Sequence, residues 1–88
     1  MVARIIRACE AKDIDQACQL LRDLHGHGYA AVDLVATLFK VAKADRELPE
    51  KKKLEFIKEI GVTHMRVVEG VESLLQLTGL LARLVEVP

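Results

Sequence analysis

Apolar side chains recur along the chain at intervals of three and four residues, the spacing that places them on one face of an α-helix. The connections between these segments are short, and no long linker or internal repeat interrupts them. The pattern therefore predicts one all-α domain over residues 1–88, folded as a compact five-helix bundle. The predicted helices cover residues 2–10, 14 to about 26, 30–44, 49 to about 61, and 63–85.

Capping and helix-breaking residues set the expected ends of these helices. Asp13 offers an N-cap, and Gln16 three residues later completes a capping-box pattern. Pro49 suits a first helical position, where its missing N–H costs no hydrogen bond, and Gly61 is the expected stop of the same helix. Thr63 is then expected to cap the last helix. The inward-facing residues predicted for the fourth helix are Leu54, Phe56, Ile57 and Ile60.

The last predicted helix carries more apolar surface than one stripe requires. A second group of leucines, Leu77, Leu80 and Leu84, lies about 100–160° around the helix from the centre of the main apolar stripe. Such a helix is either the central one of its own bundle or faces a second chain, and periodicity leaves both open. The main stripe consists of Val67, Val71, Leu74, Leu75, Leu81, Ala82 and Val85. In the second case we expect a subunit interface at Gln76, Leu77, Leu80, Arg83 and Leu84.

Composition narrows the function classes. Hydrophobic residues make up 51% of the chain and aromatic residues only 3%, so Leu, Ile, Val and Ala must form the core. The 13 basic and 13 acidic residues give a formal net charge of zero, which argues against nucleic-acid binding through bulk positive charge. A local basic run consists of Lys51, Lys52 and Lys53, with Arg46 nearby. It is either a solvated helix face or a contact for phosphate or an acidic partner. A helical DNA-binding module that uses these four side chains is the alternative function.

Neither reactive residues nor targeting segments stand out. His25 and His27 lie two residues apart and His64 is distant, whereas a zinc site needs three or four converging ligands. Cys9 and Cys18 are too few for a disulfide framework and are expected to be reduced core thiols of an intracellular protein. We therefore expect no catalytic centre, no metal and no cofactor in this chain. No apolar run approaches the roughly 20 residues of a membrane span and no leader is recognisable, so a cytosolic or nuclear location is expected.

Three runs of residues resemble a known family. Residues 54–84, LEFIKEIGVTHMRVVEGVESLLQLTGLLARL, look like the end of a eukaryotic replication factor C small subunit, a component of clamp loaders. Residues 28–43, GYAAVDLVATLFKVAK, and residues 8–17, ACEAKDIDQA, are similar to the corresponding family stretches. Two positions depart from the family pattern: Val85 stands where Cys follows GLLARL, and Ala30 stands where Ser is common, which weakens a helix cap.

The resemblance implies a carboxy-terminal, collar-like domain of five helices. In the family, five such domains from different subunits join in a ring that holds ATPase modules, which open a sliding clamp and load it onto primer–template DNA. The family's nucleotide-binding residues, and with them ATP and magnesium, belong to that ATPase module and match no residue among these 88. The resemblance thus implies a non-catalytic assembly domain, with other clamp-loader subunits as partners, in nuclear DNA replication and repair.

Overall fold

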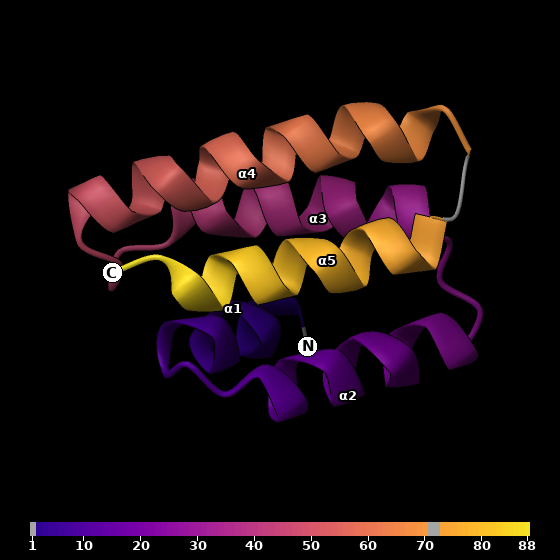
Figure 1. The fold of residues 1–88 in the computed structure, drawn as a ribbon, viewed down its shortest axis with the longest axis horizontal. Coiled ribbons are helices and arrows are strands. Elements are labelled where there is room, and N and C mark those ends of the chain that lie inside the picture. The colour runs from indigo at the N-terminus through magenta and orange to yellow at the C-terminus, as the bar shows by residue number, and fades with distance from the viewer. Residues whose placement is uncertain (1, 71–72) are drawn as a thin grey trace.

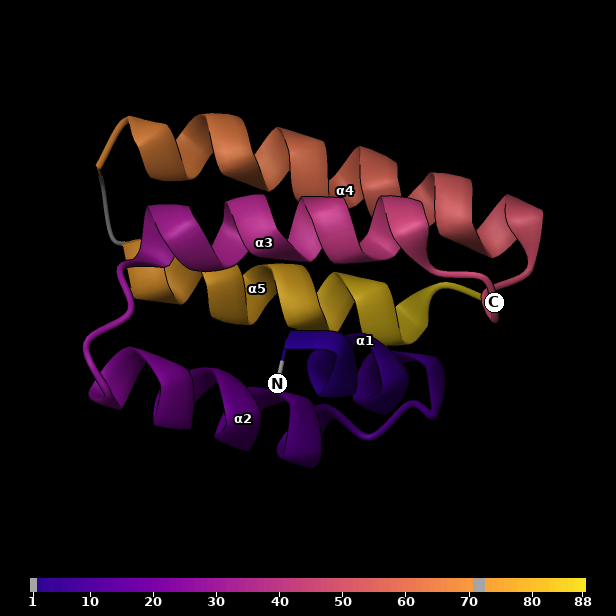
Figure 2. The same ribbon diagram turned by 180° about the vertical axis from the view of Figure 1, so that it is seen from behind.

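The computed structural model describes residues 2–70 and 73–88 of the chain. Helices α3 and α4 form an antiparallel pair, α1 and α2 lie on the opposite side, and α5 runs between them (Figure 1 and Figure 2). No helix among the described residues is both long and apolar enough to cross a membrane. The described residues form five helices and no strand, which confirms the all-α prediction: α1 (Val2–Glu10), α2 (Ile14–Gly26), α3 (Ala31–Ala44), α4 (Glu50–Val68) and α5 (Ser73–Glu86).

The central position of α5 determines the hydrophobic core. This helix packs against each of the other four helices. Four of its leucines are completely shielded by these neighbours, with 0% of their surface exposed: Leu77, Leu80, Leu81 and Leu84. Of the two interpretations left open for this helix, the central position is therefore correct, and the expected subunit interface at Leu77, Leu80 and Leu84 is wrong. They lie at the centre of the core of this one chain, because the four other helices surround the helix that carries them.

The main stripe predicted for the last helix does not form the buried face of α5. Within α5, only Leu81 of that stripe is buried. The half-buried or exposed members are Leu74, Leu75, Ala82 and Val85. Val71 lies outside the described residues. The periodicity misplaces the buried face because it continues without a break from Val67, which belongs to α4, into α5.

The boundary between the last two helices also differs from the prediction. Gly61 does not end α4 and Thr63 does not cap a helix, since α4 continues through both residues. The Thr63 side chain is fully buried, and its hydroxyl accepts a hydrogen bond of 2.8 Å from Nη2 of Arg83 on α5. The helix ends just before Gly70, which has a φ of +82° and donates its N–H to the carbonyl oxygen of Val67 at 2.9 Å. Glycine adopts this left-handed conformation without the steric cost that a Cβ imposes.

Side-chain hydrogen bonds fix the corner between α1 and α2. The Asp13 carboxylate accepts the Gln16 N–H at 3.1 Å, which confirms the predicted cap and satisfies an otherwise unpaired N–H at the start of α2. Lys12 has a φ of 61°, and its Nζ donates hydrogen bonds of 2.9 Å to the carbonyl oxygens of Val85 and Val87. The Lys12 side chain thereby joins the first corner of the fold to the end of α5.

Candidate interaction surface

The two polar residues of the predicted interface lie on α5 beside its buried leucines. Gln76 and Arg83 are both half-buried. Arg83 is held within the chain, since its Nε pairs with Oε1 of Glu59 at 2.9 Å and its Nη2 donates to the Thr63 hydroxyl. These contacts join α5 to α4. Of the predicted interface residues, Gln76 and Arg83 are the ones that retain exposed surface.

A different set of residues, most of them apolar, lies on the outer side of α4. We call it the outer face of α4; its members follow one another at alternating intervals of four and three residues and so lie on one side of the helix. They are Leu54, Lys58, Gly61, Met65 and Val68. The exposed fractions are 58% for Leu54, 73% for Met65 and 65% for Val68. The prediction that Leu54 faces inward is wrong, because it lies two residues before the buried Phe56 and therefore about 200° around the helix from it.

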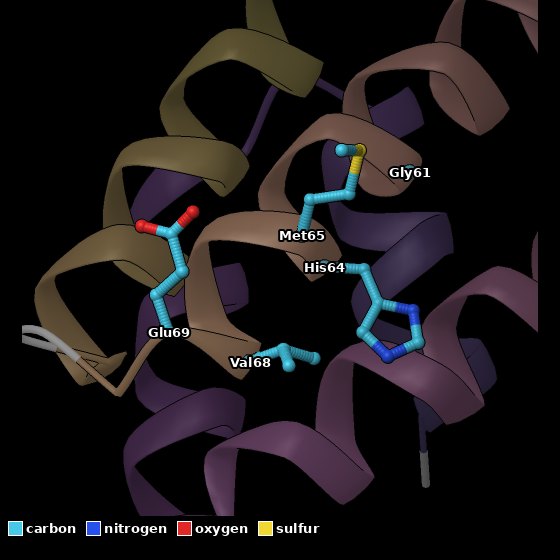
Figure 3. A pocket seen from close by; sticks show the side chains of 5 residues that line it. All are labelled: Gly61, His64, Met65, Val68 and Glu69. Atoms are coloured by element: carbon cyan, nitrogen blue, oxygen red, sulfur yellow. The ribbon is translucent and has the colours of Figure 1, made fainter.

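The C-terminal half of the outer face of α4 borders a shallow hollow of about 460 Å³. Figure 3 shows His64, Met65 and Val68 projecting from the helix around it, with the Met65 side chain reaching toward Gly61. Glu69 completes the lining. A Cβ placed on Gly61 would meet no atom within 4 Å, so the space above this stretch of helix backbone is open.

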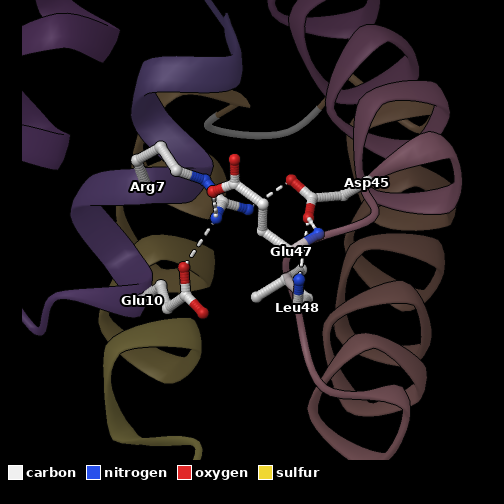
Figure 4. Close-up of polar contacts among 5 residues, drawn as sticks. All are labelled: Arg7, Glu10, Asp45, Glu47 and Leu48. Carbon is white, nitrogen blue, oxygen red and sulfur yellow. Dashed lines mark hydrogen bonds and ion pairs between the residues drawn. The ribbon is translucent and has the colours of Figure 1, made fainter.

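An arginine binds two carboxylates in the turn between α3 and α4. Nη1 of Arg7 pairs with Glu10 and with Glu47 at 2.7 Å each, and Nη2 pairs with Asp45 (Figure 4). Asp45 also accepts the N–H groups of Glu47 and Leu48 at 2.8 and 2.9 Å, which fixes the turn. Burial alone raises the pKa of Asp45, but these N–H groups and the Arg7 guanidinium outweigh it and hold the pKa below its ordinary value of 3.8.

The predicted basic residues lie in this turn and at the start of α4. Arg46 and Lys51 are exposed, whereas Lys52 and Lys53 are half-buried. None of the four forms an ion pair with another residue that the structure describes. The carboxylates on either side of Arg46 in the sequence are both bound by Arg7. Because one guanidinium faces three carboxylates, counting Glu10, this cluster remains net negative beside Arg46.

The histidines and cysteines are spread over the fold. His25 and His27 are exposed at the end of α2, and His64 lies at the hollow on α4. Within residues 2–70 and 73–88, no three His, Cys, Asp or Glu side chains lie close enough together to hold a metal ion. Cys9 and Cys18 are both free, with Cys9 buried and Cys18 half-buried. Burial, and in second place the nearby Cys18, raises the pKa of Cys9 to about 12.

Comparison with protein families shows which family this chain matches. The family described as the replication factor C C-terminal domain matches residues 1–83. The chain belongs to this family. Similar proteins include "Replication factor C subunit 4" of Schizosaccharomyces pombe, 45% identical over 91% of this chain, and "Replication factor C subunit 2" of Arabidopsis thaliana, 45% identical over 94% of it. "Probable replication factor C subunit 2" of Dictyostelium discoideum is 40% identical over 96% of the chain. The chain covers 23 to 25% of the length of these curated relatives, about a quarter.

The sequence of this replication factor C domain contains a pattern that indicates the outer face of α4. Leu54, Gly61 and Val68 are each seven residues apart, and Met65 lies between the last two. The pattern is readable only if the helix continues past Gly61. An expected stop at Gly61 removes Met65 and Val68 from the helix and leaves Leu54 without partners on the same face.

Proposed function

We propose that this replication factor C domain assembles with other subunits of a DNA sliding-clamp loader into a pentameric collar. Family membership supports this function, as do the names of its relatives, each of which is called a subunit. Since the chain corresponds to about a quarter of those relatives, the proposal gives this quarter the assembly role. Binding of ATP and magnesium falls to the remainder of such a protein. The assembled loader would act on the sliding clamp and primer–template DNA in the nucleus, during replication and repair.

The observation that carries the proposal is the outer face of α4. The exposed fractions of Leu54, Met65 and Val68 together amount to about two complete apolar side chains. Burying that much apolar surface contributes about 3–6 kcal/mol, whereas bringing two proteins together costs about 4–15 kcal/mol. The face therefore stabilises an assembly only as part of a larger contact. A ring in which each domain meets two neighbours supplies such a contact.

Two polar residues on α5 belong to the same proposal. Gln76 and Arg83 retain exposed surface at the edge of α5. The guanidinium of Arg83 carries five N–H groups, and its contacts with Glu59 and Thr63 use two of them. We propose that the others, together with the Gln76 amide, bind polar groups of a neighbouring subunit.

The test is assembly of the full-length protein with two charges placed on the outer face of α4, Met65→Lys and Val68→Lys. Both side chains are exposed and Lys is favourable near a helix C-terminus, so the fold is expected to change in stability by no more than about 0.5 kcal/mol. The protein is co-expressed with the other replication factor C subunits of its organism, and the mass of the complex is measured by light scattering. A control, Ala82→Lys, places one lysine at an exposed position of α5.

We expect the control to form the complete complex and the double variant to remain largely unassembled. Thermal unfolding of each purified variant checks that the loss of assembly is not a loss of folding. A double variant that folds and forms a complex of normal mass and normal affinity contradicts the assignment of this face to subunit assembly.

A second candidate function uses the basic residues at the start of α4. The observation that favours it is that Arg46, Lys51, Lys52 and Lys53 form no ion pair among the described residues. A helical DNA-binding module that uses Arg46 and Lys51–Lys53 would bind duplex DNA with an affinity that falls steeply as salt rises. Fluorescence anisotropy of labelled primer–template DNA measures this, and absence of binding at low salt removes the candidate.

A further inference from the structure

Gly61 occupies a position where nothing among the described residues requires a glycine. Inside a helix, glycine lowers the ratio of folded to unfolded molecules about fivefold relative to alanine. The backbone at Gly61 is helical and its φ is not in the left-handed region, unlike those of Gly28 and Gly70. No neighbouring atom excludes a Cβ either, because none lies within 4 Å of the position it would take. An alanine would therefore suit the isolated domain better, so Gly61 is suited to a contact from outside.

The neighbours of Gly61 indicate what approaches it. On the outer face of α4 the intervals alternate between four and three residues, so its members form one continuous stripe along the helix. The distance between two packed helices depends on the side chains at the contact, and small side chains allow the shortest distance. Gly61 lies in the middle of the face, with Leu54 and Val68 seven residues to either side. The arrangement fits a helix that crosses at Gly61 and packs against the larger side chains on both sides of it.

We propose that the outer face of α4 binds an α-helix of a neighbouring clamp-loader subunit, which lies directly over Gly61. This inference rests on the proposed function and names the partner for the same face. The exposed apolar surface equals about two side chains, less than the roughly 800 Å² that each partner of a stable pair buries, so one docked helix matches it better than a dimer of this chain. Lys58 is the one charged member of the face and forms no ion pair among the described residues. The partner helix is therefore expected to carry a carboxylate opposite Lys58.

The test uses Gly61→Ala and Gly61→Leu in the full-length protein, co-expressed with the other replication factor C subunits of its organism. Gly26→Ala is the matched control, because Gly26 is also helical and also has open space around its Cβ position. The melting temperature of the purified protein reports folding, and the affinity for the other subunits reports docking. Gly61→Ala is expected to raise the melting temperature of this domain by about 4–8 °C.

Subunit affinity is expected to move in the opposite direction from stability. Gly61→Ala is expected to weaken the complex about tenfold because the added methyl group separates the two helices, and Gly61→Leu is expected to weaken it further. Gly26→Ala leaves the affinity unchanged. A more stable domain with weaker assembly distinguishes a docked helix from a general loss of structure, which would lower both quantities.

Three results would overturn this inference. If Gly61→Ala and Gly61→Leu both leave the affinity unchanged, no helix lies over Gly61, although loss of assembly in the variant with Met65→Lys and Val68→Lys would still support the proposed function. If the protein purified alone is a dimer that Gly61→Leu makes monomeric, the occupant is a second copy. If Gly61→Leu destabilises the full-length protein purified alone, the occupant is another segment of the same protein.

Discussion

Replacement of Leu80 by Ala tests whether the leucines of α5 form the core of this chain or a surface for another one. Leu80 is 0% exposed and lies on the helix that contacts all four others. Truncating a buried leucine removes apolar contacts and leaves a cavity, at a cost of about 2–5 kcal/mol. Because several helices would have to move together to fill the cavity, we expect a loss in the upper part of that range, about 3–5 kcal/mol.

The size of the domain makes this loss easy to measure. At about 0.05–0.15 kcal/mol per residue, the total free energy of unfolding is about 4–13 kcal/mol, so Leu80→Ala removes a large share of it. The assay is urea unfolding of the 88-residue chain, followed by far-UV circular dichroism. The matched control is Leu75→Ala on the same helix, which is expected to change the free energy of unfolding by less than about 0.5 kcal/mol because Leu75 is 65% exposed.

The reasoning would be refuted if Leu80→Ala and Leu75→Ala had the same free energy of unfolding. It would also be refuted if Leu80→Ala lost less than about 1 kcal/mol on unfolding while its association with other subunits weakened. Either result would mean that Leu80 contributes little to the fold of the isolated chain, contrary to its burial among the other helices.

Two further predictions concern titratable groups. The pKa of Asp45 is lowered in the folded state, so its contribution to stability is present above the ordinary value of 3.8 and is lost as the pH falls through the folded pKa. Asp45→Asn is therefore expected to lower the urea midpoint at neutral pH, and the difference from the original protein should shrink as the pH falls below 3.8; a difference that is constant with pH contradicts this. Cys9, buried and with a pKa of about 12, is expected to react with a thiol reagent far more slowly than Cys18 in the folded protein, and at a similar rate in urea. Equal rates without urea, measured by mass spectrometry of the labelled peptides, would contradict the burial of Cys9.

The first three helices were predictable from residues that are close together in the sequence. Asp13 caps α2 through its own side chain, and the apolar periodicity of each helix matches the face that it buries. The basic run was also placed correctly near the start of α4, since Pro49 immediately precedes that helix. These features depend on residues that are close together in the sequence.

The boundary between α4 and α5 was not predictable from local chemistry. Gly61 and Gly70 are both plausible stops, and only Gly70 adopts the left-handed conformation. Beyond Gly61, α4 buries Thr63 and Val67, and Arg83 of α5 donates a hydrogen bond to the Thr63 hydroxyl. These tertiary contacts outweigh the roughly 1 kcal/mol that a glycine costs inside a helix. Because the boundary was expected at Gly61, the predicted buried stripe of α5 lay on the wrong side of the helix. For the same reason Leu54, Met65 and Val68 were not assigned to one face of α4.

The place of α5 in the order of helices has a consequence for biosynthesis. During translation α5 leaves the ribosome after the four helices that surround it. Until then the nascent segment lacks the leucines that fill its centre, so the apolar side chains of the other helices that pack against α5 stay accessible to solvent and to chaperones. Resistance to protease on the ribosome is therefore expected to arise in one late step, when α5 is released, and not helix by helix.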